Sequence, residues 1–183
     1  MIEVKRVSDI WELQGIKSLQ EVNLSRNISS DEATREGFLT VSYTIDFLEE
    51  MHRDEPSIIA KVDDEVVGYA LVSTKKMRSR HDLLEGLFNV IDNCAYNHQS
   101  LSEINYIVVG QLCVAKNFRG QGLVQRLYGH FKDCLNEQYD YLVTDVAKDN
   151  IRSLKAHQKT GFQVISELEY GGLGWNVVLW DWR

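Results

Sequence analysis

The sequence predicts a single α/β (α+β) domain in which helices flank a mixed central sheet. The chain has 183 residues, of which 44% are hydrophobic, and a chain of this length buries a sufficient core without disulfides or metals. Its apolar residues recur with the period of a strand in some segments and of a helix in others. A hairpin in the first half precedes helices that alternate with strands, which indicates a mixed sheet covered by helices. No repeat, low-complexity tract or linker divides residues 1–183, so we expect one domain.

The first half combines helices with a hairpin. A short strand is followed by a helix with regularly spaced apolar residues, and a capping box, Ser29-Ser30-Asp31-Glu32, opens a second helix. Two β-rich runs joined by Asp63-Asp64 predict a hairpin. The expected elements are a strand at 2–4, helices from about 9, from about 29 and through 47–51, and strands at 57–62 and 65–73.

Residues 75–101 form an excursion before the second half. Four basic residues come first, and apolar residues at helical spacing then predict an amphipathic helix, whose apolar face must be buried. The basic residues are Lys75, Lys76, Arg78 and Arg80, and the apolar residues are Leu83, Leu84, Leu87, Phe88 and Ile91. The elements expected next are a strand at 104–114, a helix at 120–135, a strand at 141–146, a helix at 150–160 and two closing strands, the last at 176–182.

Charge and composition exclude several classes of protein. The formal net charge is −7, which disfavours a protein that coats nucleic acid. The three cysteines are odd in number and lack C-x-x-C spacing, so we expect neither a disulfide framework nor a metal site. No apolar run approaches the roughly 18 residues of a membrane span, and the first ten residues do not resemble a signal peptide. We therefore expect a cytoplasmic protein without a nucleic-acid or membrane partner.

The turn that follows the strand at 104–114 is the most informative segment. The strand ends in Leu112-Cys113-Val114, a basic turn contains Arg119-Gly120-Gln121-Gly122, and a helix begins at once with Leu123-Val124. The first turn of a helix presents unpaired N–H groups and about half a positive charge, so it binds anionic oxygens. The two glycines lack the Cβ atoms that would hold a phosphate away from these amides. The segment therefore predicts a pyrophosphate cradle made mostly of backbone.

Two common phosphate-binding motifs do not fit this turn. A P-loop has Gly-Lys-Ser/Thr at the helix start, whereas Leu123 and Val124 follow Gly122 here. A dinucleotide-binding motif requires a third glycine where the chain has Gln125. The turn instead resembles the motif Q/R-x-x-G-x-G/A of the GCN5-related N-acetyltransferase (GNAT) family. Arg119 takes its first position, Gly122 its fourth, and Val124 stands where glycine or alanine is usual.

A second segment is similar to the next motif of this family, N-x-x-A-x-x-x-Y-x-x-x-G-F. Asn150, Ser153 and His157 precede Gly161-Phe162, and their spacing places them on one helical face, which the resemblance puts along the pantetheine arm of acetyl-CoA. The resemblance implies the acyl-CoA N-acyltransferase (GNAT) fold, with a mostly antiparallel sheet of six to seven strands, acetyl-CoA as the acetyl donor and no metal. The implied cofactor-binding residues are Leu112, Cys113, Val114, Arg119, Gly120, Gln121, Gly122, Leu123, Val124, Asn150, Ser153 and His157.

The catalytic candidates follow from the chemistry of acetyl transfer. A tyrosine often protonates the departing thiolate in this family, and His157 stands at its position. An ordinary pKa near 6.5 leaves an imidazole partly protonated at neutral pH, although a histidine without a chemical role is the alternative. An acceptor amine is protonated at neutral pH, so a base must take its proton. The candidates for this base are Glu103, Tyr106 and Asp145.

Two roles are expected near the end of the strand at 104–114. The resemblance implies that a backbone N–H around Cys113 and Val114 polarises the thioester carbonyl. We expect the thiol of Cys113 itself to pack in the core rather than to carry an acetyl group, because it lies in an apolar strand without an assignable histidine.

The predicted activity is direct transfer of an acetyl group from acetyl-CoA to a primary amine of a small molecule or peptide. Residues 1–65 carry a formal charge of −8 and residues 66–183 of +1. The resemblance implies that the N-terminal helices border the acceptor, so the acidic first third suggests a cationic amine. We expect the excursion to cover the acceptor site or to form a homodimer contact. The alternatives are a catalytically inactive acyl-CoA-binding sensor or regulatory module and a nucleotide-dependent enzyme.

Overall fold

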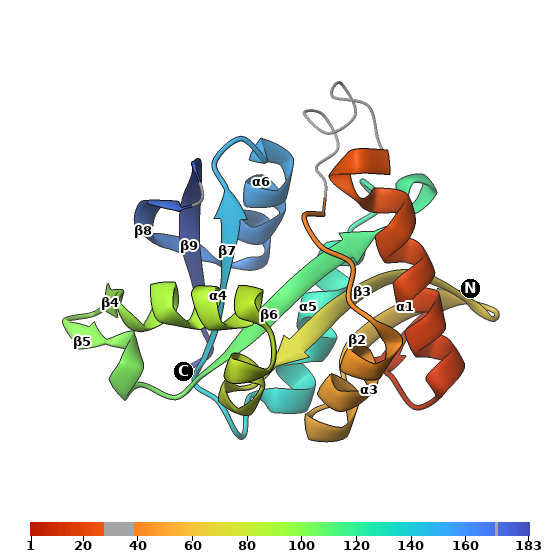
Figure 1. Cartoon of the computed structure of the whole chain (residues 1–183), viewed down its shortest axis with the longest axis horizontal. Coiled ribbons are helices and arrows are strands. Elements are labelled where there is room, and N and C mark those ends of the chain that lie inside the picture. Colours follow the sequence, from red (N-terminus) through yellow and green to blue (C-terminus); the bar gives the residue numbers. More distant parts are fainter. Residues whose placement is uncertain (28–38, 171) are drawn as a thin grey trace.

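Within the described residues, 1–27, 39–170 and 172–183, the computed structural model contains one seven-stranded sheet with helices on both faces (Figure 1). The strand order is β1-β2-β3-β6-β7-β9-β8, and neighbouring strands are antiparallel except β6 and β7. The prediction of a mixed, mostly antiparallel sheet is therefore confirmed. The strands are β1 (Ile2–Arg6), β2 (Ile58–Val62), β3 (Glu65–Ser73), β6 (Tyr106–Val114), β7 (Tyr141–Ala147), β8 (Gln163–Tyr170) and β9 (Leu173–Asp181).

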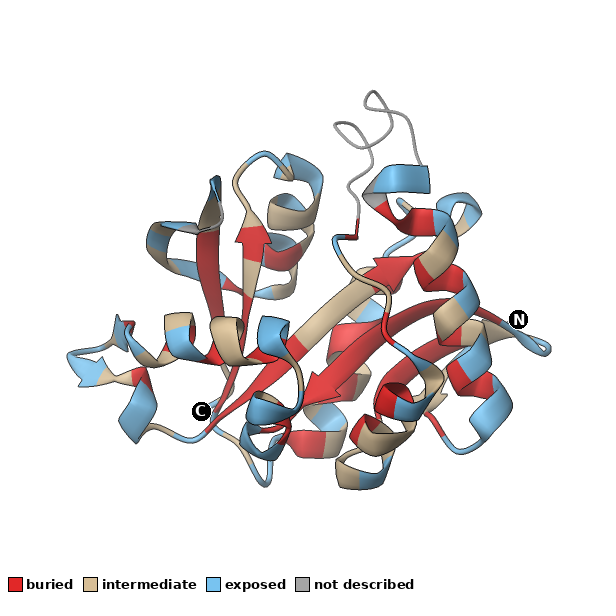
Figure 2. Ribbon diagram, in the orientation of Figure 1, coloured by how far each residue is buried: buried red, intermediate tan, exposed pale blue. Residues whose placement is uncertain are grey.

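The helices are divided between the two faces of the sheet. They are α1 (Ile10–Asn23), α3 (Ile45–Asp54), α4 (Asp82–Asp92), α5 (Leu123–Leu135) and α6 (Ile151–Thr160). Helices α1, α3 and α4 bury Leu13, Leu48 and Phe88 in one core. Helix α5 buries Leu127 and Phe131 in a second core on the opposite face, and α6 packs against α5. Figure 2 shows that the central strands between the two cores are buried along most of their length.

The predicted hairpin joins β2 to β3. Its turn contains Asp63, whose φ is 51°, a left-handed conformation that aspartate tolerates better than most residues. From Val66 to Ser73, β3 is buried at every residue. A strand covered on both faces reads as a continuous apolar run, which is why this segment lacks alternation.

The excursion leaves the sheet between β3 and β6. It consists of a 3-10 helix (Lys75–Arg80), α4, the small hairpin of β4 (Ala95–Tyr96) and β5 (Gln99–Ser100), and a 3-10 turn (Leu101–Glu103). The predicted apolar face of α4 is confirmed, because Leu84 and Phe88 are fully buried. Arg78 donates to Glu85 (Nε to Oε1, 3.1 Å) and to Asp92 (Nη1 to Oδ2, 2.6 Å). These ion pairs fasten the basic turn to the helix.

Several boundaries differ from the sequence-based expectation. The first strand, expected at 2–4, extends to Arg6, and the last strand, expected at 176–182, spans Leu173–Asp181. The strand expected from Ile104 begins at Tyr106, because a 3-10 turn precedes it. The helix expected from Gly120 begins at Leu123. Gly120 and Gly122 have φ values of +76° and +74°, which lie outside the helical region.

Two further points concern the expected capping box and the length of the helices. The capping box at 29–32 lies outside the described residues. Across the described ranges, every helix is too short or too polar to cross a membrane.

Candidate functional site

Strands β6 and β7 separate at a fork near the middle of the sheet. They pair in parallel through three residues, of which the last pair is Val108 and Val143. At the next position, Oγ1 of Thr144 donates to the carbonyl of Val109 at 2.8 Å, so a side chain ends the ladder. Beyond it, β6 pairs with β3 and β7 with β9, and their ends lie apart in Figure 1. The fork leaves a cleft between two strand edges.

A β-bulge in β6 lies directly beyond the fork. The register of β3 with β6 passes from Val72 opposite Val109 to Leu71 opposite Gln111, so Gly110 is unpaired. A Cβ atom at Gly110 would overlap the Ser73 hydroxyl, which explains why glycine occupies the bulge. Bulges redirect the strand that carries them.

The backbone of β6 presents two amides to the cleft. The N–H of Ala115 donates to the carbonyl of Val67 on β3 at 2.8 Å. Successive N–H groups of a strand point to opposite edges, so the N–H groups of Leu112 and Val114 face away from β3 and towards the cleft. Of the two positions expected to polarise a carbonyl, Val114 fits this role. The amide of Cys113 faces β3 instead, and Leu112 takes its place.

The turn before α5 forms the predicted backbone cradle. Gly122 is the N-cap of α5, and no side chain among the described residues caps the helix. The first-turn amides therefore remain available for an anion. Apart from Gly120 and its two chain neighbours, no described residue has an atom within 4 Å of the position that a Cβ atom of Gly120 would take, so the cradle is open. Leu123 is buried beneath the turn, whereas Gln121 is exposed and donates to the carbonyl of Asn117 at 2.9 Å.

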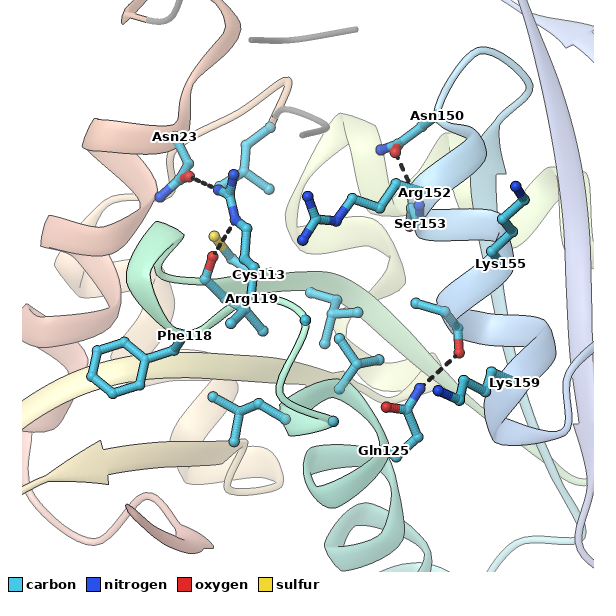
Figure 3. Close-up of a pocket in the computed structure, with 18 residues that line it drawn as sticks. Asn23, Cys113, Phe118, Arg119, Gln125, Asn150, Arg152, Ser153, Lys155 and Lys159 are labelled. Atoms are coloured by element: carbon cyan, nitrogen blue, oxygen red, sulfur yellow. Dashed lines mark hydrogen bonds between the residues drawn. The ribbon is translucent and has the colours of Figure 1, made fainter. Parts of the chain in front are cut away.

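Arg119 braces this turn. Its Nε donates to the carbonyl of Val114 at 2.9 Å, and its Nη2 donates to Oδ1 of Asn23, the last residue of α1, at 2.5 Å. Figure 3 shows the guanidinium between these partners at the cavity wall. The residue therefore supplies a positive charge to the cavity and also fixes the position of the turn.

Helix α6 forms the opposite wall. Oδ1 of Asn150 accepts the N–H of Ser153 at 3.1 Å and caps the helix. Arg152, Lys155 and Lys159 also line this wall, and in Figure 3 Arg152 extends from α6 towards the side of the cavity that carries Arg119. These three cations are not among the residues predicted for the site, although their clustering in a short polar helix is visible in the sequence.

A first cavity of about 280 Å³ lies between the cradle and α6. Its described lining contains four cations and no carboxylate. An open amide cradle beside four cations fits a ligand that carries several phosphates, such as acetyl-CoA. The predicted residues that line it are Leu112, Cys113, Val114, Arg119, Gly120, Gly122, Leu123, Val124, Asn150 and Ser153; Gln121 and His157 do not.

A second cavity of about 310 Å³ adjoins the first. Residues of α4 line one side of this cavity. The divergent ends of β6 and β7, the start of β9 and residues 39–43 also bound it. Four residues line both cavities: Leu39, Leu112, Asn150 and Ser153. A ligand in one cavity can therefore meet a ligand in the other at the fork.

Asp145 is the carboxylate of the second cavity. Burial raises its pKa to about 6. No side chain in the described part of the chain hydrogen-bonds to its carboxylate. Burial is the main reason that the pKa of Tyr43 is raised, and the negative charge of Asp145 raises it further. A carboxyl with this pKa is ionised at neutral pH and able to accept a proton.

His157 lines the second cavity in contact with Tyr128 of α5. Its Nδ1 lies 2.8 Å from the carbonyl of Ser153, which can only accept, so Nδ1 carries the proton. Its Nε2 then accepts the hydroxyl of Tyr128 at 2.7 Å. Burial lowers the pKa of His157 to about 4, so the expectation that the ring is partly protonated at neutral pH is wrong. Tyr128 retains its proton, because burial raises its pKa.

Three other candidates lie in different surroundings. Burial raises the pKa of the Cys113 thiol to about 12, so little thiolate is available for acetylation. Glu103 is exposed in the 3-10 turn before β6. The Tyr106 hydroxyl donates to Oδ1 of Asp92 at 2.6 Å beneath α4. Glu103 and Tyr106 line neither cavity, whereas Asp145, the third candidate for the base, lines the second cavity.

Comparisons with known proteins agree with this geometry. The Acetyltransferase (GNAT) family model matches residues 24–162. No curated protein sequence matches the chain significantly.

Solved structures resemble the chain over its whole length. The NatC complex bound to Gag peptide and CoA contains a chain with 13% identity and a TM-score of 0.67, covering 100% of this chain and 99% of that chain. The putative acetyltransferase yncA from Salmonella typhimurium with acetyl-CoA has 13% identity and a TM-score of 0.65, covering 100% and 94%. The ribosomal-protein-S18-alanine N-acetyltransferase from Escherichia coli has 10% identity and a TM-score of 0.63, covering 99% and 94%. At identities of 10–13%, this similarity shows that the chain shares the fold of these proteins.

Proposed function

Because the chain belongs to the acetyltransferase (GNAT) family, we propose that it transfers the acetyl group of acetyl-CoA directly to the primary amine of a cationic acceptor. Family members use acetyl-CoA and need no metal. The proposal depends on one observation, the meeting of two unlike cavities at the fork. The first has an amide cradle and four cations, and the second has a carboxylate that forms no ion pair with any described residue.

The residues at the fork suit the two halves of this reaction. Acetyl-CoA, when bound, supplies an acetyl group activated as a thioester. Asp145 takes a proton from the acceptor ammonium, directly or through water, because its carboxylate is ionised above about pH 6. The amine nitrogen then forms the new C–N bond as the C–S bond breaks. The N–H groups of Leu112 and Val114 stabilise the negative charge that develops on the carbonyl oxygen.

The departing thiolate needs a proton, and we assign it to the pair formed by Tyr128 and His157. At neutral pH the pair holds its transferable proton on the Tyr128 hydroxyl, since Nε2 of His157 accepts that hydroxyl. The histidine orients the hydroxyl and lines the same cavity. In this proposal the pair takes over the role of the tyrosine that the family often uses, and His157 stands at that tyrosine's position in the motif.

The direct test is acetyl transfer by the purified chain. Acetyl-CoA is incubated with a panel of primary amines, free thiol is followed over time, and the acetylated product is identified by mass spectrometry. We expect thiol release that depends on both the enzyme and the amine. Calorimetric binding of CoA without turnover on any acceptor would overturn the proposal in favour of a binding module. Stronger thermal stabilisation by ATP or NAD than by CoA would favour a nucleotide-dependent enzyme.

A further inference from the structure

The walls of the second cavity are mainly apolar. Six parts of the chain contribute apolar residues, and α4 supplies the largest apolar share. The apolar lining includes Leu83, Leu84, Leu87 and Val90 of α4 and Leu173 and Trp175 of β9. At about 310 Å³, the cavity is at the lower end of the roughly 300–1,000 Å³ of small-molecule sites. It therefore has room for a modest apolar group.

The charge of this cavity is simple. Among the described residues that line it, Asp145 is the one carboxylate, and there is no lysine or arginine. A ligand with one ammonium group finds a partner here. A ligand with a carboxylate, or with a second ammonium in the cavity, would bury an unpaired charge at a large cost.

Two polar side chains of the lining, those of Gln111 and Thr144, are already bonded within the protein. Oε1 of Gln111 accepts from Gln20 at 2.8 Å and from Tyr69 at 2.6 Å, while its Nε2 donates to the carbonyl of Val41 at 2.9 Å. The hydroxyl of Thr144 is bonded at the fork. These groups offer little to the hydroxyls of an amino sugar or to the amides of a peptide, and such groups are costly to bury unpaired.

Two exposed leucines extend the apolar lining outwards. Leu83 of α4 is 43% exposed and Leu173 of β9 is 44% exposed, and both line the cavity. An apolar rim continuous with an apolar interior favours a ligand whose body is apolar as well.

We propose that the acceptor is an apolar monoamine, a small molecule with a single primary ammonium group on an alkyl or aryl body and with no carboxylate. This inference depends on the proposed function, because it names the class of amine that the acetyl group reaches. In the second cavity the ammonium group faces Asp145, and the body lies against α4 and the rim. The ammonium loses one proton to Asp145 to form the attacking amine. It loses a second proton as the amide forms, and this proton replaces the one that Tyr128 gives to the departing thiolate.

Matched acceptors test this inference at saturating acetyl-CoA. Phenethylamine is compared with phenylalanine, which adds a carboxylate, and hexylamine with 1,6-diaminohexane, which adds an ammonium. Glucosamine and a tetrapeptide with an N-terminal phenylalanine complete the panel. We expect kcat/KM for each monoamine to exceed that of its charged counterpart by about tenfold or more, and to exceed those of glucosamine and the peptide. A charged, sugar or peptide acceptor that equals the monoamines would overturn the inference.

Leu173→Glu tests the same idea from the side of the protein. Leu173 is exposed at the rim, so the added carboxylate does not have to be buried. We expect the ratio of kcat/KM for 1,6-diaminohexane to that for hexylamine to rise about fivefold or more. Val22→Glu is the matched control, because Val22 is 64% exposed on α1 and lines neither cavity.

The outcomes separate this inference from the proposed function. Transfer to polar or multiply charged amines, or an unchanged ratio in Leu173→Glu, would overturn the inference and leave acetyl transfer standing. An absence of transfer to every acceptor, despite binding of CoA, would overturn both.

Discussion

Nε2 of His157 accepts the hydroxyl of Tyr128 across 2.7 Å, and this bond joins α6 to α5 beside the second cavity. The other ring nitrogen donates to the carbonyl of Ser153, so the tautomer is fixed. A buried neutral histidine of this kind cannot protonate a leaving group at pH 7 without help, whereas the tyrosine retains its proton. Tyr128 therefore holds the proton, and His157 orients the hydroxyl that carries it.

Tyr128→Phe removes the proposed proton donor with little change in volume. We expect kcat to fall about a hundredfold, with KM for acetyl-CoA nearly unchanged, because the first cavity does not include Tyr128. Steady-state kinetics measure both. Tyr139→Phe is the control, since its hydroxyl lies outside both cavities. Wild-type turnover in Tyr128→Phe would contradict the assignment, and wild-type turnover in His157→Ala would remove the histidine from the mechanism.

Asp145→Asn tests the base through the pH dependence of the rate. The carboxylate accepts a proton once it is ionised, so kcat/KM of the wild type should rise as the pH increases through about 6. The variant should lose this limb and, at pH 7.5, about a hundredfold of the rate. Measurements of kcat/KM from pH 5 to pH 9 for the wild type and the variant test this prediction. A wild-type profile in the variant would exclude Asp145 as the base.

The same substitution should stabilise the fold. The folded-state pKa of Asp145, about 6, is above the ordinary value of 3.8, so the unfolded chain loses this proton first. The wild type consequently loses stability as the pH rises from about 4 to about 6, and the loss persists above this range. We expect the Tm of Asp145→Asn to exceed that of the wild type by about 2–6 °C at pH 7.5, with the difference vanishing below pH 4. A lower Tm at pH 7.5 would contradict the burial of an unpaired charge.

Gly120→Ala tests the amide cradle. Gly120 and Gly172 both have φ of +76° and open space where a Cβ would lie, so alanine strains both backbones alike, by about 1 kcal/mol. Gly172 lies outside the first cavity. We expect Gly120→Ala to weaken CoA about tenfold in calorimetric titrations, and Gly172→Ala to leave the affinity unchanged. Equal affinities in the two variants would show that phosphates do not approach the Gly120 backbone.

Much of the fold could be predicted from the sequence, because its determinants are local. The hairpin at Asp63, the apolar face of α4 and the strand–turn–helix unit around Gly122 each depend on residues that are close in the chain. Most of the predicted cofactor-binding residues belong to this unit or to the motif that begins at Asn150, and most of them line the first cavity.

The remaining features depend on contacts between residues that are distant in sequence. Gln20 and Gln111 are 91 residues apart, and no periodicity relates them. The bulge at Gly110 is a property of the register between two strands. Tyr128 reads from the sequence as one more core residue of an amphipathic helix, and its role becomes visible only beside the ring of His157.

The short ladder between β6 and β7 also makes the sheet mechanically uneven. Three residue pairs and the Thr144 hydroxyl join the strands β1, β2, β3 and β6 to β7, β9 and β8, whereas β7 and β9 pair through seven residues. The short ladder between β6 and β7 is therefore the natural hinge between the two stiffer parts of the sheet. We expect CoA to slow amide hydrogen exchange at Val109 and Thr144 more than within the hairpin of β2 and β3. Uniform slowing across the sheet would indicate that the two parts do not move as separate bodies.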